Sequence, residues 1–160
     1  MRLFAVSGYS GTGKTTLVEA LIQELTKRGY SVATVKSTKE TLSDVEGSDT
    51  WRHRVAGAAA TALLSPQAAV TWQYKLLGLK DVLRDWKYDF VLIEGMKDVD
   101  LPKFWCVRDI SKDEMRSRNV KALITHPDSS IEWQNDEVEV LTSDDISILA
   151  DIIEQEAAPI

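Results

Sequence analysis

The chain of 160 residues is 44% hydrophobic and 28% charged, with a formal net charge of −6. A chain of this length can bury a full hydrophobic core, so we expect a single domain over residues 1–160. No apolar run approaches the roughly 18 residues of a membrane helix, and the acidic balance disfavours attraction to nucleic acid or anionic membranes. The residues before Ser7 lack the basic leader and apolar stretch of a signal peptide. We therefore expect a cytoplasmic protein that binds neither nucleic acid nor membranes.

The first part of the chain predicts a strand, a loop and a helix in that order. RLFAVSG is almost entirely apolar, which is typical of a strand buried on both faces of a parallel sheet. Apolar residues then recur at helical spacing over residues 14–28, and Gly29 is a helix stop. Residues 31–36 (SVATVK) predict a second strand, which a long polar loop separates from a helix that Asp49 is expected to cap.

The remaining segments continue the alternation of strands and helices. TALLS and AAVTW predict two short strands around a turn, and residues 74–86 predict a helix. Further strands are expected in DFVLIEG, KFWCVRD, VKALIT and VEVLT, followed by a helix over residues 144–156 and a frayed end, AAPI. The alternation predicts an α/β fold with a doubly wound, mostly parallel sheet and helices on both faces.

The segment between the first strand and the first helix matches the pattern G-x-x-x-x-G-K-[ST] of the P-loop, which assigns the fold to the P-loop NTPase type. Glycines let backbone N–H groups turn inward around phosphate oxygens, and the helix that follows presents its free N–H groups to the same anion. Lys14 is expected to reach the terminal phosphates, and Thr15 to ligate Mg²⁺. The predicted nucleotide-binding loop comprises Gly8, Tyr9, Ser10, Gly11, Thr12, Gly13, Lys14, Thr15 and Thr16.

A P-loop site usually has an acidic residue on another strand, which holds Mg²⁺ through water. DFVLIEG offers Asp89 at the entry of the strand and Glu94 at its exit. Ligands bind at the carboxyl ends of strands in open parallel sheets, so Glu94 is the preferred metal carboxylate and Asp89 is interpreted as structural. The alternative for Glu94 is a solvated carboxylate before a turn.

The sequence resembles the MobB family, the molybdopterin-guanine dinucleotide biosynthesis protein B, in five landmarks that occur in the same order. They are GYSGTGKTTL, VATVKST, GSDTWRHRVAGA, DFVLIEGMK and PKFWCVRD. The resemblance implies a homodimeric protein that binds GTP with Mg²⁺ and is at most a slow GTPase. It also implies two partners, the guanylyltransferase MobA and molybdopterin or its guanine dinucleotide.

The family pattern carries over to residues outside the loop. Glu94 and Asp49 match its acidic positions, and together with Thr15 they are the predicted metal ligands. Asp49 has two compatible interpretations, as a helix cap and as a loop carboxylate that closes on Mg²⁺. A basic rim for phosphate or the pterin is expected from Lys36, Arg52, Arg54, Lys97, Lys103 and Arg108.

Some of these basic residues have a plainer interpretation, as surface charges that pair with nearby carboxylates, such as Lys97 with Asp98 or Arg108 with Asp109. One departure from the family also stands out. Ser37, Lys39 and Glu40 occupy places where the family commonly has histidines, so either other residues supply the function of those histidines or the chain is a divergent member with another client.

Three other features are weaker signals. THPD, at residues 125–128, is either a turn opened by proline or a motif whose aspartate accepts from guanine, and the turn is preferred. His53 and His126 lack the neighbours that a zinc site needs. Cys106 lies in the apolar run FWCV and is interpreted as a core residue.

Two functions remain open from the sequence. The first is a GTP-binding adaptor in molybdenum-cofactor guanylylation, in which the choice of guanine follows from the resemblance alone. The second is a small P-loop kinase or ATP-dependent ligase that acts on an acidic metabolite. A partition-type ATPase is disfavoured, because Tyr9 stands where that subgroup has a second lysine.

Overall fold

The computed structural model describes residues 1–108, 118–129 and 138–160. The chain divides into two compact units, and each is described by itself. The sheet unit comprises Met1–Thr38 and Lys87–Ile160, and the inserted unit comprises Lys39–Trp86.

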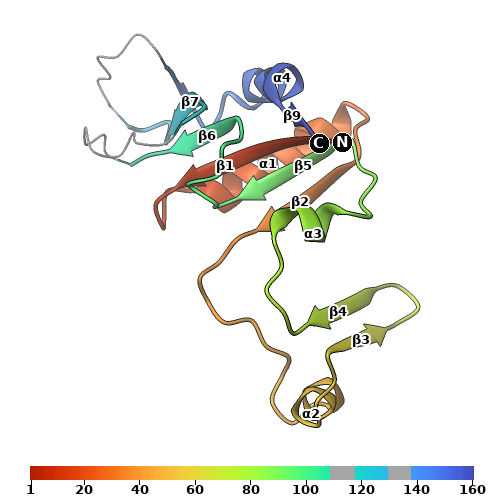
Figure 1. Cartoon of the computed structure of the whole chain (residues 1–160). Coiled ribbons are helices and arrows are strands. Elements are labelled where there is room, and N and C mark those ends of the chain that lie inside the picture. The colour runs from red at the N-terminus through yellow and green to blue at the C-terminus, as the bar shows by residue number, and fades with distance from the viewer. Residues whose placement is uncertain (109–117, 130–137) are drawn as a thin grey trace. The chain divides into compact units, whose positions relative to one another are not determined.

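The sheet unit holds a seven-stranded sheet with the strand order β2-β5-β1-β6-β7-β8, while β9 pairs separately with β1 (Figure 1). Neighbouring strands are parallel except for β9, which is antiparallel to β1. The strands are β1 (Arg2–Gly8), β2 (Val32–Lys36), β5 (Phe90–Glu94), β6 (Lys103–Cys106), β7 (Val120–Thr125), β8 (Glu139–Thr142) and β9 (Ala158–Pro159). The helices are α1 (Lys14–Lys27) and α4 (Ile146–Glu156).

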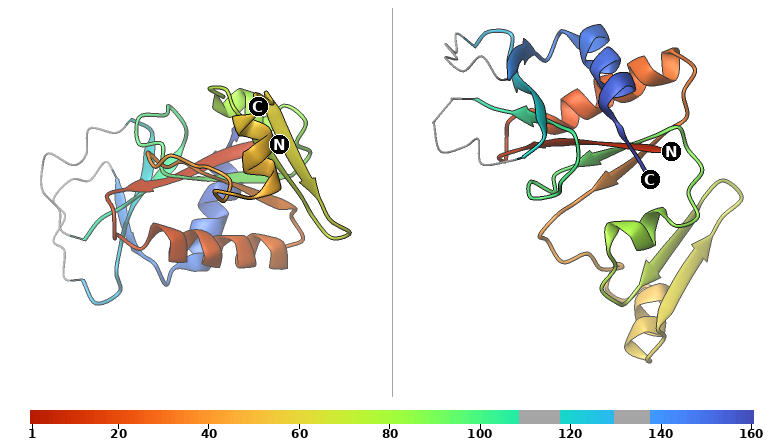
Figure 2. Two further views of the ribbon diagram at one scale, coloured as in Figure 1. Left: turned by 90° about the horizontal axis from the view of Figure 1, so that it is seen from below. Right: turned by 45° about the horizontal axis from the view of Figure 1, so that its top comes forward.

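The hydrophobic core lies between the sheet and the two helices α1 and α4, which cover the same face of the sheet (Figure 2). The rings of Phe4 on β1 and Phe104 on β6 lie 4.6 Å apart between their centroids, and Leu21 of α1 is fully buried against this layer. At the end of α1 the Arg28 guanidinium donates a hydrogen bond to the Asp151 carboxylate of α4. The predicted α/β fold, with a mostly parallel sheet flanked by helices, is confirmed.

The inserted unit contains α2 (Asp49–Val55), the antiparallel strands β3 (Ala60–Leu64) and β4 (Ala69–Gln73), and the short helix α3 (Leu79–Leu83). The buried Asp44 carboxylate organises its polar interior. It accepts hydrogen bonds from Arg54 Nε at 3.0 Å and from the Tyr74 hydroxyl at 3.3 Å, and that hydroxyl also lies 2.6 Å from Thr61 Oγ1. The two strands predicted around the Ser65 turn are confirmed.

The helix expected over residues 74–86 is wrong at both ends, because α3 spans only Leu79–Leu83. α3 begins only at Leu79, because Gly78 adopts an extended conformation and its N–H donates to the Asp81 carboxylate at 3.0 Å. Leu76, which the helical pattern would bury, is fully exposed. A glycine at a helix start is a stronger local signal than the spacing of leucines on either side of it.

Three further boundaries differ from the sequence predictions. Ser48, and not Asp49, is the N-cap of α2, and its Oγ accepts from the Trp51 N–H at 3.3 Å. The last helix begins at Ile146, because the Asp145 carboxylate turns back to accept from the N–H and hydroxyl of Thr142. The final residues do not fray, since β9 pairs with the amino end of β1.

Within the described ranges, no helix combines the length and the apolar character that crossing a membrane requires.

Candidate functional site

The glycine-rich loop, residues 8–16, joins β1 to α1 at the carboxyl edge of the sheet. Gly8 has a φ of +140°, and a Cβ added there would lie 2.4 Å from the carbonyl oxygen of Cys106 on β6. Gly13, with a φ of +82°, is the N-cap of α1. A glycine N-cap has no side-chain oxygen to accept from the first-turn N–H groups, so these groups are suited to hold an external anion.

Thr15 and Glu94 meet at the start of α1. The Thr15 hydroxyl donates to Glu94 Oε1 at 2.8 Å, although the two residues are 79 positions apart in the sequence. The parallel register pairs Val6 of β1 with Glu94 at the end of β5. The Glu94 carboxylate therefore lies beside the loop that follows β1. Two of the three predicted metal ligands are therefore adjacent.

Asp89 lies at the opposite end of β5 and has a structural function. Its carboxylate accepts from the Ser31 N–H at 2.8 Å and from the Ser31 hydroxyl at 2.7 Å. These hydrogen bonds stabilise the charged form and lower the pKa of Asp89. Asp89 thus ties the start of β5 to the segment before β2, as expected for the carboxylate at the entry of the strand.

Lys14, Lys36, Lys97 and Glu94 form a charged cluster beside the glycine-rich loop. The Lys14 ammonium donates to the Tyr9 carbonyl, and its pKa is lowered, mainly by burial and also by Lys97 and Lys36, while Cys106 and Glu94 oppose the shift. Lys36 Nζ lies 3.3 Å from Glu94 Oε1. The charges of Glu94, Lys97 and Lys36 therefore all act on Lys14.

Lys97 is positioned by aromatic contacts. Its ammonium lies 3.6 Å from the centroid of the Tyr9 ring, which itself meets Trp105 edge to face with centroids 6.2 Å apart. A cation over an aromatic face is attracted by the ring's electron density. Tyr9, in addition to its place in the loop sequence, therefore holds a basic residue near the loop.

Contrary to the prediction from the sequence, Lys103 does not belong to an exposed basic rim. Its side chain is buried at the first position of β6, and Nζ donates to the carbonyl oxygens of Lys97 and Val99 in the preceding connection. Burial lowers its pKa. By donating to these backbone carbonyls, Lys103 holds the connection that carries Lys97 instead of facing a ligand.

The other predicted rim residues are divided between the units. Arg108 lies at the end of β6, with its guanidinium about 3.8 Å from the position that a Cβ on Gly11 would take. Asp109, its alternative partner, lies outside the described residues. Arg54 pairs with Asp44 inside the inserted unit.

The two remaining inserted-unit residues of the predicted site form an exposed pair. Arg52 Nη1 lies 3.6 Å from Asp49 Oδ1 on the surface of α2, and both side chains are largely exposed. This contact matches the plainer interpretation of Arg52 as a surface charge. A metal-binding function of Asp49 stays a prediction.

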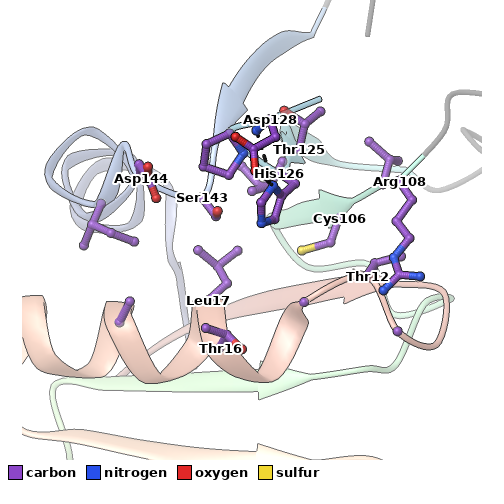
Figure 3. A pocket seen from close by; sticks show the side chains of 17 residues that line it. Thr12, Thr16, Leu17, Cys106, Arg108, Thr125, His126, Asp128, Ser143 and Asp144 are labelled. Carbon is purple, nitrogen blue, oxygen red and sulfur yellow. Dashed lines mark hydrogen bonds and ion pairs between the residues drawn. The ribbon is translucent and has the colours of Figure 1, made fainter. Parts of the chain in front are cut away.

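A cavity of about 820 Å³ opens from the glycine-rich loop across the carboxyl ends of β6, β7 and β8. Figure 3 shows Thr16 and Leu17 of α1 along one wall, Thr12 and Arg108 at one end, and His126, Asp128, Ser143 and Asp144 along the far side. Residues 126–129 form a turn, with the Ser129 N–H donating to the His126 carbonyl at 2.9 Å. THPD therefore forms the expected turn, and because this turn lines the cavity, its presence does not decide against the guanine-accepting aspartate.

Ser143 and Asp144 were missed by the sequence interpretation. They follow β8, and the Ser143 N–H donates to the carbonyl of Thr125 at 3.0 Å, which draws the two loops together. Their position directly after a strand of a parallel sheet could have identified them, because ligands bind at the carboxyl ends of such strands.

The sheet, the glycine-rich loop and the Thr15 to Glu94 contact together define a P-loop α/β protein. The family model of MobB, described as molybdopterin guanine dinucleotide synthesis protein B, matches residues 3–126. The chain therefore belongs to the MobB family.

Individual relatives agree with this assignment. The molybdopterin-guanine dinucleotide biosynthesis adapter protein of Escherichia coli is 36% identical over 115 residues, which are 67% of this chain and 66% of that protein. A relative from Methanocaldococcus jannaschii is 37% identical over 116 residues, 68% of this chain and 48% of the relative. The chain thus spans about half to two thirds of the length of these relatives.

A solved structure supports the fold over nearly the whole chain. The crystal structure of a MobB protein homolog from Bacillus stearothermophilus superposes with a TM-score of 0.74 at 26% identity, covering 97% of this chain and 99% of that one.

Cys106 provides a test of the packing beneath the loop. It is the single cysteine of the chain and is 1% exposed, and burial raises the pKa of its thiol from 9.0 to about 12. Because the thiolate is the reactive form and the sulfur is buried, we expect alkylation by iodoacetamide at pH 8 to be at least tenfold slower in the folded protein than in urea, as measured by mass spectrometry. Comparable rates in the two states would show that the loop does not cover Cys106.

Proposed function

We propose that the protein binds GTP with Mg²⁺ at the glycine-rich loop and acts as an adaptor in molybdopterin-guanine dinucleotide biosynthesis. The single observation that carries the nucleotide part is the contact between Thr15 Oγ1 and Glu94 Oε1 at the start of α1. A hydroxyl and a carboxylate side by side, next to a loop suited to phosphate, are the donors that a P-loop protein uses for its metal.

The donor set suits Mg²⁺ in particular. Both donors are hard oxygen atoms, and the described residues contain no group of three or more histidine, cysteine or acidic side chains placed so that it could hold a metal ion. Mg²⁺ prefers one or two protein ligands and completes its coordination with waters and substrate phosphates. Thr15 and Glu94 would hold the ion, which would offset the charge of the terminal phosphates.

The cavity supports a nucleoside on the other side of the loop. Its volume of about 820 Å³ falls within the range of small-molecule sites. Asp128 and Asp144 line its far side, and carboxylates accept hydrogen bonds from the N1–H and N2–H₂ groups of guanine. The two carboxylates therefore favour guanine over adenine, because adenine has no N–H at N1 and no amino group at C2.

The adaptor part of the proposal is supported by family membership and by the names of the relatives. The E. coli relative is named as an adapter protein of molybdopterin-guanine dinucleotide biosynthesis. For this chain we propose a MobA-like guanylyltransferase and molybdopterin, or its guanine dinucleotide, as partners. We propose at most slow GTP hydrolysis, since no glutamine or histidine of the sequence stands out as a residue that would orient the attacking water. A cytoplasmic location stays a prediction.

We also propose a homodimer, and the β3–β4 hairpin of the inserted unit supports it. A two-stranded sheet is marginally stable alone, yet Leu63, Leu64 and Val70 of this hairpin are exposed. Sedimentation equilibrium of the full chain should show a dimer that Leu64→Glu weakens at least tenfold. Leu76→Glu, at an exposed leucine outside the hairpin, should have little effect. A monomeric wild-type protein would contradict the proposal.

Nucleotide binding is tested by thermal unfolding of the wild-type protein with GTP or ATP in the presence of Mg²⁺. A ligand present at about 100 times its Kd stabilises the folded state by about 2.7 kcal/mol. We expect GTP to raise the midpoint of unfolding more than ATP at equal concentration, and Lys14→Ala to abolish both shifts while leaving the ligand-free midpoint nearly unchanged. A Lys14→Ala variant that keeps the shift would contradict the assignment of the loop.

The choice of metal carboxylate is tested by a pair of matched variants. Glu94→Gln should raise the Mg²⁺ concentration that gives half of the GTP-induced thermal shift at least tenfold, because an amide oxygen carries no charge. Asp89→Asn should lower the ligand-free midpoint, since it weakens the contacts to Ser31, but should keep the wild-type Mg²⁺ dependence. The reverse ranking of the two Mg²⁺ dependences would exclude Glu94 as the metal carboxylate.

A further inference from the structure

The glycine-rich loop has two different sides. Because β1 is a central strand of the sheet, β6, β7 and β8 lie on one side of it and β5 and β2 on the other. The nucleoside-sized cavity opens over the first side. The second side supplies Glu94 from β5 and Lys36 from β2, whose register pairs them at the ends of their strands. Glu94 and Lys36 thus lie across β1 from the cavity.

A single carboxylate oxygen serves two contacts in this cluster. Glu94 Oε1 accepts from the Thr15 hydroxyl at 2.8 Å and lies 3.3 Å from the Lys36 ammonium. A divalent cation held by Thr15 and Glu94 would share this carboxylate with the Lys36 ammonium, and two cations repel each other at such range. The ammonium and the metal therefore compete for the Glu94 carboxylate.

Lys36 is able to leave that position. Its side chain is 63% exposed, whereas that of Glu94 is 13% exposed. A lysine ammonium is a compact charge on a flexible stem of four carbons, and exposed ion pairs of this kind are weak. The carboxylate stays in place and the lysine moves.

Withdrawal of Lys36 would leave basic charge on this side of the loop with less compensation. Lys36 and Lys97 both act on Lys14, and Glu94 is a carboxylate that counters them. Once Glu94 serves a metal ion, it no longer neutralises Lys36. A group of ammonium charges near one another then favours a polyanionic ligand such as phosphate.

We propose that Lys36 and the divalent cation exchange at the Glu94 carboxylate, and that the released Lys36, together with Lys97, then binds the phosphate group of a second ligand. The inference rests on the proposed nucleotide function and adds an order of events to it. Metal and nucleotide bind first, and the second phosphate site forms as a result.

The exchange is tested by titrating Mg²⁺ into the full chain with GTP and following the midpoint of thermal unfolding. Lys36→Met keeps the length of the side chain and removes its charge. It should lower the Mg²⁺ concentration that gives half of the shift by about two- to fivefold, as expected for loss of an exposed pair. Lys97→Met removes the same charge from the same cluster, and Lys27→Met removes it from the far end of α1. A decrease as large in either control as in Lys36→Met would overturn the exchange.

The second site is tested with inorganic phosphate, added to protein saturated with a non-hydrolysable GTP analogue. Phosphate should raise the midpoint of wild-type unfolding more with Mg²⁺ than with EDTA. This excess should be lost in Lys36→Met and Lys97→Met, and kept in Lys27→Met. An excess that persists in both cluster variants, or is absent from the wild type, would overturn the second site.

Failure of this inference is distinguishable from failure of the proposed function. If the analogue and Mg²⁺ do not stabilise the wild-type protein, both are wrong. If they do and Lys14→Ala abolishes the effect, while Lys36→Met behaves as the wild type does, then the nucleotide site stands and the exchange is wrong.

Discussion

The candidate site is built around the hydrogen bond between Thr15 and Glu94, which depends on how α1, β1 and β5 are arranged in the sheet unit. Thr15 lies in the first turn of α1, and Glu94 is the last residue of β5. They meet because β5 pairs directly with β1 in a register that ends both strands at the same edge. The hydrophobic residues that bury β1 and β5 against α1 are therefore also the residues that bring a hydroxyl and a carboxylate together.

The same edge holds two environments of different character. Over β6 to β8 the loop opens into a cavity whose walls include Leu17 as well as polar side chains, which suits a nucleoside. Over β5 and β2 it lies beside the Glu94 carboxylate, which pairs with Lys36, and the charges of Glu94, Lys36 and Lys97 all act on Lys14. Because several lysines lie close together at this edge, a protein with a net negative charge can still attract phosphate there.

Lysine and arginine residues that the sequence does not distinguish have different structural functions in this protein. Lys103 is buried and donates to backbone carbonyls, Arg54 completes the polar interior of the inserted unit, and Lys36 pairs with Glu94. Their side chains are all long and cationic, so composition does not distinguish them. The surroundings do, because a buried cation must find acceptors whereas an exposed one remains exchangeable.

Local chemistry in the sequence determined the strands, the glycine-rich loop, the preference for Glu94 over Asp89 and the membership of the family. These features depend on short patterns: an apolar run, a glycine with positive φ, an acidic residue at a strand end. Local reasoning fails at Gly78, because the spacing of the leucines predicts a helix that continues through this residue, whereas Gly78 is the N-cap of α3. Only the tertiary structure decided that Lys103 is buried, that the final residues pair with β1 and that Lys36 and Thr15 share one oxygen of Glu94. Such contacts join segments far apart in the chain, and the register of the sheet, which no single segment encodes, sets the distance between them.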